Sequence, residues 1–204
     1  MSPEGRMLVN RAQLTKLICT NVGVNMEPAN VSSLLLTDDE PDYVLFKVAI
    51  EAAERGANVW FISTEPFVAI PDNIEQPEKH VLRLITFIYL KTLDDLVEHL
   101  DGTHAWYKPP SLIILKDAHS YCGLAEDRCD VFKAAMLATV LIDSAACCAS
   151  KRSTKCRVLV TCWGCVDDSL QVLYDMYFSE VLVKREFDDD ESLLVKVRDF
   201  LSRK

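Results

Sequence analysis

The stretch VSSLLLTDDEPDYVLFKVAIEAAERG, residues 31–56, decides the fold. It begins with an apolar run that ends in three leucines, which is typical of a strand buried on both faces of a parallel sheet. Over residues 42–55 the apolar positions recur at helical spacing, and a glycine follows, as it often does just past a helix end. The stretch therefore predicts a strand and the helix that covers it.

The same alternation continues to the end of the chain. Strands are predicted at residues 58–63, within 82–90, and at 112–115, 157–161 and 181–184, and helices at 92–100, 127–149 and 169–177. Residues 193–201 are predicted to form a helix or a strand. This order favours a mostly parallel central sheet flanked by helices, an α/β fold. Residues 1–30, with a short helix at 10–19, are predicted to be an extension of a core domain over residues 31–204.

Composition is that of a globular protein. Of 204 residues, 50% are hydrophobic and 26% are charged, and the formal net charge is −9. A net negative charge argues against nucleic-acid binding over the whole surface, because a phosphate backbone is negative too. A local basic patch is compatible with this charge. The eight cysteines, with no signal sequence and no apolar run near the ~20 residues of a membrane span, predict reduced thiols in a soluble protein of the cytosol or nucleus.

The turn after the first strand is where a ligand of such a sheet would bind. A nucleotide-binding loop needs glycines, whose amides wrap a phosphate, and a lysine. This turn has neither, and its carboxylates would repel a polyphosphate. They suit the N-terminus of the following helix, with a divalent-metal site as the alternative. The degenerate loop consists of Thr37, Asp38, Asp39, Glu40, Pro41 and Asp42.

The apolar run at residues 112–115 would carry the second nucleotide motif. In an ATP site, a carboxylate that holds magnesium ends such a run. Here Lys116 takes that place and Asp117 comes one residue later, where strand alternation would turn the side chain to the opposite face. We therefore expect both nucleotide motifs to be degenerate, and we expect no cofactor, no metal ion and no catalytic residue.

In order and spacing, these segments resemble the RecA-like core of eukaryotic recombinase paralogues, and most of all the paralogues that associate with a SWIM-domain protein in the Shu complex. The resemblance covers residues 31–187 and is carried by SSLLL, KVAIEAAERG, VWFIST, EPFVAIP, LRLITFIYLKTLDDLVEHL, PPSLIILKD, ATVLIDSAACCASKR, CRVLVTCWG and DDSLQVLYDMYF. It implies a three-layer RecA-like sandwich with degenerate Walker A and Walker B motifs.

The resemblance also implies a function. A paralogue of this kind is a pseudo-ATPase subunit in the nucleus that pairs with a SWIM-domain zinc-finger protein as a heterodimer. It contacts the recombinase or other paralogues and promotes filament assembly on single-stranded DNA, in homologous recombination, DNA repair and meiosis. The alternative is a pseudo-ATPase scaffold of an Elongator-type ring that modifies transfer RNA. A third hypothesis is an enzyme, either an ATPase with a rebuilt loop or a thiol oxidoreductase.

Two further motifs have a structural and a functional interpretation. Cys162 and Cys165 have the spacing of a redox thiol pair, but they come late in the chain and lack a second pair at zinc-ribbon spacing, so structural thiols are favoured over redox chemistry or a metal. The densest basic run is expected to be a solvated loop, with DNA contact as the alternative. It consists of Lys151, Arg152, Lys155 and Arg157.

Partner contacts are harder to place from the sequence. Phe67, between two prolines, is a candidate exposed anchor for a partner, and residues 9–19 and 193–201 are candidate docking elements. Phe132 begins an F-x-x-A motif of the kind by which recombinase protomers bind their neighbours. We expect Phe132 to pack in the protein core instead, because the apolar face of its helix needs both fixed residues of the motif. His99 lies near a helix C-terminus, where a cation is favoured.

Overall fold

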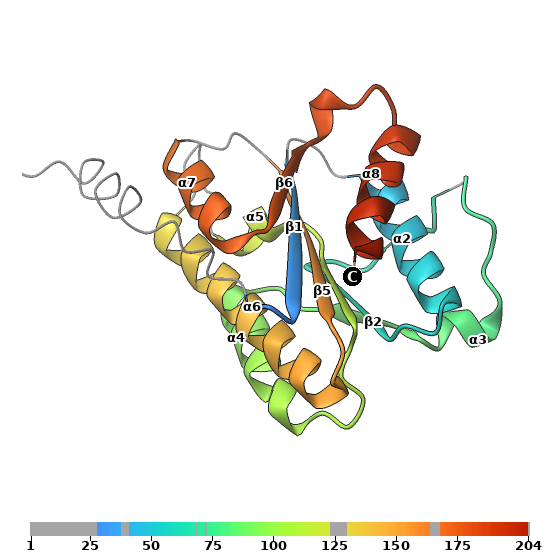
Figure 1. Cartoon of the computed structure of the whole chain (residues 1–204), viewed down its shortest axis with the longest axis horizontal. Helices are drawn as coiled ribbons and strands as arrows, with labels where there is room; N and C mark the ends of the chain where they lie inside the picture. The colour runs from blue at the N-terminus through green and yellow to red at the C-terminus, as the bar shows by residue number, and fades with distance from the viewer. Residues whose placement is uncertain are drawn as a thin grey trace, which may run out of the picture.

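The computed structural model describes residues 28–37, 41–67, 69–71, 73–122, 130–163 and 168–203. Their six strands form one sheet of order β3-β2-β4-β5-β1-β6, and every neighbouring pair is parallel (Figure 1). The strands are β1 (Val31–Thr37), β2 (Val59–Ser63), β3 (Ile85–Tyr89), β4 (Leu112–Leu115), β5 (Cys156–Cys162) and β6 (Glu180–Val183). The predicted α/β class is confirmed, and the sheet is wholly parallel over these residues.

Helices cover both faces of the sheet, which Figure 1 shows edge-on between them. One layer consists of α2 (Asp42–Glu54), α3 (Lys79–Leu82) and α8 (Asp190–Ser202). The other consists of α4 (Leu93–Asp101), α5 (Ala118–Tyr121), α6 (Val131–Arg152) and α7 (Asp168–Tyr177). Short 3₁₀ turns lie at Gly102–Ala105 and Lys184–Glu186. The predicted extension at residues 10–19 lies outside the described residues.

The apolar strands bury side chains in two separate cores. Leu34 and Leu36 of β1 pack under α2 and α8, whereas Leu35 between them packs under α6. All three are at most 1% exposed. Successive residues of a strand point to opposite faces, so a strand covered on both sides needs an apolar residue at every position. This is why the leucine run predicted an interior strand.

Capping residues fix several helix ends. Thr92 and Asp95 form a capping box at the start of α4. Asp189 caps α8 together with Ser192, so the C-terminal segment, predicted as a helix or a strand, is a helix. Gly56, just after α2, has a φ of 83°, a left-handed conformation that glycine adopts without strain. The four-residue helices α3 and α5 had no signal in the sequence.

Helix α6 is central to its layer and packs between α4 and α7. By length and composition alone it is apolar enough to cross a membrane, contrary to the expectation of no such stretch, and 44% of that window is buried inside the structure. The core helix of a globular protein passes the same test. Its contacts with β1 and β5 identify it as such a core helix.

Candidate functional site: a crevice at the carboxyl ends of the strands

A crevice of about 510 Å³ opens at the carboxyl ends of β2 and β4, beside the start of α2. The chain leaves β2 towards α3 on one face of the sheet and leaves β4 towards α5 and α6 on the other, and ligands of parallel sheets bind at such switch points. The crevice is lined by Asp42, Ser63, Thr64, Glu65, Pro66, Phe67, Ala69, Lys116, Asp117 and Ser120.

An ion pair spans this crevice. The ammonium of Lys116 lies 2.8 Å from Oδ1 of Asp42 and donates a hydrogen bond of 2.9 Å to Oδ2. The side chains of Lys116 and Asp42 are 17% and 39% exposed. The same ammonium lies 5.3 Å from the ring centroid of Phe67, a cation–π contact. The pair therefore ties the end of β4 to the first turn of α2.

The predicted capping role fits Asp42 only in part. Pro41 is the N-cap of α2, and no side chain caps this helix by a hydrogen bond. The charge of Asp42 still lies in the first turn, where the helix dipole favours an acid. The other predicted acids of the turn, Asp38, Asp39 and Glu40, lie outside the described residues.

Asp117 also lines the crevice, so the prediction that it faces away is wrong. The strand ends at Leu115, and Asp117 adopts the left-handed conformation, with φ 56° and ψ 62°. Its N–H donates to Oγ1 of Thr161 at 2.9 Å, and the hydroxyl of Ser120 donates to its Oδ2. Its Oδ1 is buried and has no hydrogen-bond partner among the residues that the structure describes. A non-glycine residue held there costs about 1–3 kcal/mol, and such strain clusters at functional sites.

Aromatic side chains mark the same edge of the sheet beyond β5. Trp163, the residue after β5, is 55% exposed. Its ring lies 5.6 Å from that of His119 on α5, in an edge-on arrangement. Trp163 lies within the motif that Cys162 and Cys165 define. Its exposure had no signal, because a tryptophan next to an apolar strand is usually buried.

Phe67 is half-buried, contrary to the exposed anchor expected from its flanking prolines. Its ring packs 4.5 Å from Phe46 and 4.9 Å from Phe61, measured between centroids, and so belongs to the core under α2. It forms one wall of the crevice. Partner contact by Phe67 stays a prediction, and only part of the ring is accessible for it.

Phe132 lies outside the core, and the expectation that it packs inside is wrong. Its side chain is 77% exposed in the first turn of α6, whereas Ala135, the other fixed residue of the motif, is half-buried. The core side of this turn consists of Ala134, Leu137 and Ala138. The helix can bury only one side on the sheet, and Phe132 is on the other.

The basic run lies at the amino ends of the strands, across the sheet from the crevice, because Cys156 at the start of β5 pairs with Val31 at the start of β1. Lys151 donates to the carbonyls of Thr103, His104 and Trp106. Arg152 donates to the carbonyl of Pro109, and Arg157 to that of Arg203. These side chains hold neighbouring loops by hydrogen bonds to their backbone carbonyls. Lys155, the remaining residue of the run, is half-buried. DNA contact by the run stays a prediction.

The described cysteines are free thiols. Cys162 is buried with its Sγ 3.3 Å from the hydroxyl oxygen of Tyr174, whereas Cys165 lies outside the described residues. Cys148 hydrogen-bonds to Cys156, and this bond lowers the pKa of the Cys148 thiol and raises that of Cys156. Among the described residues, no group of three or more His, Cys, Asp or Glu side chains is placed to hold a metal ion.

His99, near the end of α4, packs against two tryptophan rings. Its ring lies 5.3 Å from Trp60 and 4.7 Å from Trp106. Burial lowers the pKa of His99, because desolvation penalises the charged form. Its Nε2 is buried and has no hydrogen-bond partner within the described part of the chain.

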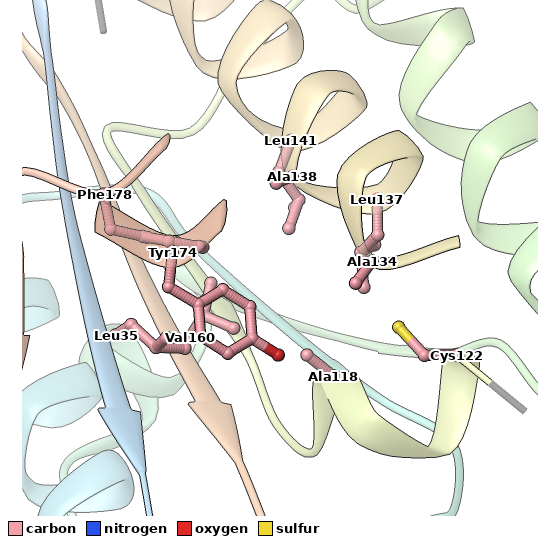
Figure 2. A pocket seen from close by; sticks show the side chains of 10 residues that line it. All are labelled: Leu35, Ala118, Cys122, Ala134, Leu137, Ala138, Leu141, Val160, Tyr174 and Phe178. Carbon is pink, nitrogen blue, oxygen red and sulfur yellow. The ribbon is translucent and has the colours of Figure 1, made fainter. Parts of the chain in front are cut away.

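A narrow cavity lies between α6, α7 and the sheet (Figure 2). Its volume is about 10 Å³, close to the least that holds one water molecule. Figure 2 shows Tyr174 between Leu35 and Val160 of the sheet and the small side chains of α6. With an almost wholly apolar lining and no room for a ligand, this cavity is a gap in core packing.

Comparison with known proteins adds no identification. No family model matches this chain, and no curated protein matches it.

Proposed function

We propose that this chain is a non-catalytic RecA-like subunit that pairs with a SWIM-domain protein and promotes recombinase filament assembly in homologous recombination. The sheet order is compatible with a RecA-like sandwich, because β1 lies inside the sheet with β5 between it and β4. The family, the partner and the nuclear location in this proposal rest on the sequence resemblance. The non-catalytic role rests on the crevice.

The ion pair between Lys116 and Asp42 carries the non-catalytic part of this proposal. A phosphate at the start of α2 would meet the carboxylate of Asp42, and two negative charges 4 Å apart repel by about 4 kcal/mol at an effective dielectric constant of ~20. The lysine that would attract the phosphate is already held by Asp42. The pair thus favours a crevice that joins two parts of the fold over one that binds a nucleotide.

In a non-catalytic subunit, we expect the side chains that bind partners or DNA to lie exposed on the surface. Phe132 protrudes from α6 within an F-x-x-A motif, which suits a grip on a recombinase protomer. The exposed Trp163 forms an aromatic pair with the half-buried His119 at the carboxyl edge, where single-stranded DNA bases can stack. Both features support a subunit that acts by binding.

The test is affinity purification of the tagged full-length chain from cells, with identification of the associated proteins. We expect a SWIM-domain protein and a recombinase in the wild-type sample. Phe132→Ala should lose the recombinase and keep the SWIM-domain protein, and Lys133→Ala, beside it on the exposed turn, serves as the matched control. Recovery of Elongator-type ring subunits instead would favour the alternative, and calorimetric binding of ATP with Mg²⁺ would refute the argument from the crevice.

A further inference from the structure

Two buried cysteines meet where helix α6 turns back to the sheet. Cys148 lies one turn before the end of α6, and Cys156 is the first residue of β5. Both residues are 0% exposed, and both belong to the core between the sheet and α6. Their thiols form a hydrogen bond with each other. No other side chain therefore separates the two sulfur atoms.

The backbone turn between the two cysteines explains this contact. Ser153, just after the end of α6, adopts the left-handed conformation with a φ of 55°. The N–H of Thr154 donates to a carbonyl of the last helical turn at 3.2 Å, which closes the helix and directs the chain back to the sheet. Only residues 153–155 separate α6 from β5. Cys148, on the side of the helix that faces the sheet, thus comes opposite Cys156 at the start of the strand.

We infer that Cys148 and Cys156 form a reversible disulfide when the chain meets a peroxide, so that the end of α6 becomes cross-linked to β5. The local charges favour Cys148 as the sulfur that reacts first. The hydrogen bond from Cys156 lowers the pKa of Cys148, and the cations of Lys151 and Arg152 act in the same direction, against the effect of burial. The same hydrogen bond raises the pKa of Cys156. Cys148 is therefore the better source of a thiolate, the nucleophilic form of cysteine.

The reaction balances with one molecule of hydrogen peroxide. The Cys148 thiolate attacks one peroxide oxygen, so that an S–O bond forms, the O–O bond breaks, and the leaving hydroxide takes up a proton to become water. The sulfur of Cys156 then attacks the sulfenic acid at Cys148. The disulfide bond forms, the S–O bond breaks, and the proton of Cys156 leaves with the hydroxyl group as a second water. The two thiols lose two electrons in all, and a small thiol restores them by disulfide exchange.

The helix end gives access to the buried pair. Hydrogen peroxide is little larger than water, and helix ends open locally without unfolding of the core. Cys148 lies one turn from the end of α6, and its neighbour Cys147 is already half-exposed. We expect opening of the last turn to expose the sulfur of Cys148. This inference concerns only the chain's own thiols, so it does not rest on the proposed recombination role.

The experiment treats the reduced full-length chain with a small molar excess of hydrogen peroxide, blocks the remaining thiols with iodoacetamide, and maps disulfides by mass spectrometry. Trypsin cleaves after Lys151, Arg152 and Lys155, so the two cysteines fall on separate peptides that only a disulfide holds together. We expect the linked peptides in the wild type and in the matched control Cys147→Ser, and their loss in Cys148→Ala. Dithiothreitol should return the wild type to free thiols.

Absence of the linked peptides from the peroxide-treated wild type would overturn the inference. Their loss in Cys147→Ser would also overturn it, because Cys147 would then be the partner of Cys156. So would a disulfide between two chains, seen as a dimer on a non-reducing gel. Because Cys148→Ala leaves a small gap in the core, Cys156→Ala serves as a second variant, and the urea midpoint shows that each variant is folded. The comparison of the wild type with Cys147→Ser needs neither alanine variant.

Discussion

Breaking the ion pair between Lys116 and Asp42 should destabilise the fold unequally, depending on which partner is removed. In Lys116→Met the carboxylate of Asp42, 39% exposed, can regain part of its hydration, although its Oδ1 is buried. In Asp42→Asn the ammonium of Lys116, only 17% exposed, loses a carboxylate that it cannot replace with water as easily. The asparagine variant also loses the favourable interaction of an acid with the helix dipole, worth about 0.3–1 kcal/mol.

The magnitude follows from the distance and the burial. At 2.8 Å the gross attraction is about 6 kcal/mol at an effective dielectric constant of ~20. Desolvation and side-chain ordering offset most of this attraction, so an exposed ion pair contributes only about 0.2–1 kcal/mol to stability. Removal of one partner from a fully buried pair costs more, about 3–5 kcal/mol. For this half-buried pair we expect a loss of about 1 kcal/mol in Lys116→Met, about 2 kcal/mol in Asp42→Asn, and a coupling energy near 1.5 kcal/mol.

A double-mutant cycle in urea measures these quantities. The four proteins are the wild type, the two single variants and the double variant, and each free energy of unfolding comes from a linear extrapolation with m held constant. Lys116→Met costing as much as Asp42→Asn would contradict the burial argument. A coupling energy below about 0.3 kcal/mol, within the usual error of additivity, would show that the pair does not join the end of β4 to α2.

Four further predictions test the core, the surface and the titrating groups. Burial lowers the pKa of His99, so the unfolded chain takes up a proton at a higher pH than the folded chain does. The free energy of unfolding should therefore fall as the pH drops below about 6.5. His99→Gln should reduce the difference in unfolding free energy between pH 7.5 and pH 5.5, measured in urea. Leu34→Ala should lower the free energy of unfolding by about 2–5 kcal/mol, seen as a lower melting temperature, since the side chain is fully buried. Phe132→Ala should change stability by less than about 0.5 kcal/mol in the same melt. If single-stranded DNA binds at the carboxyl edge, Trp163→Ala should weaken it by about 1–3 kcal/mol in fluorescence anisotropy, whereas Lys151→Glu should leave the salt dependence unchanged.

The layers of this fold were predictable because they depend on local patterns. Leu34, Leu35 and Leu36 in succession require a strand covered on both faces, and that arrangement is what the sheet has. The helix predicted at residues 92–100 is α4, and the capping box of Thr92 and Asp95 at its start depends on residues only three positions apart. In both cases neighbouring residues alone determine the outcome.

The crevice was less predictable because it depends on residues far apart in the sequence. The pairing of Lys116 with Asp42 joins positions 74 residues apart. Alternation along a strand placed Asp117 on the wrong side, since the strand had already ended and the backbone had turned left-handed. Phe132 was misplaced for a related reason: a helical pattern shows which residues share a side, but which side meets the sheet is decided by packing.

At the amino edge, the cations of Lys151, Arg152 and Arg157 donate to backbone carbonyls, so their charge holds loops in place. At the carboxyl edge, the ammonium of Lys116 is matched by Asp42, and the exposed rings include Trp163 and Tyr89. With a net charge of −9, such a molecule has little means to attract a nucleic acid at long range. Under the proposed function, binding of DNA by this chain would therefore depend on base stacking and on charge supplied by the proposed partner.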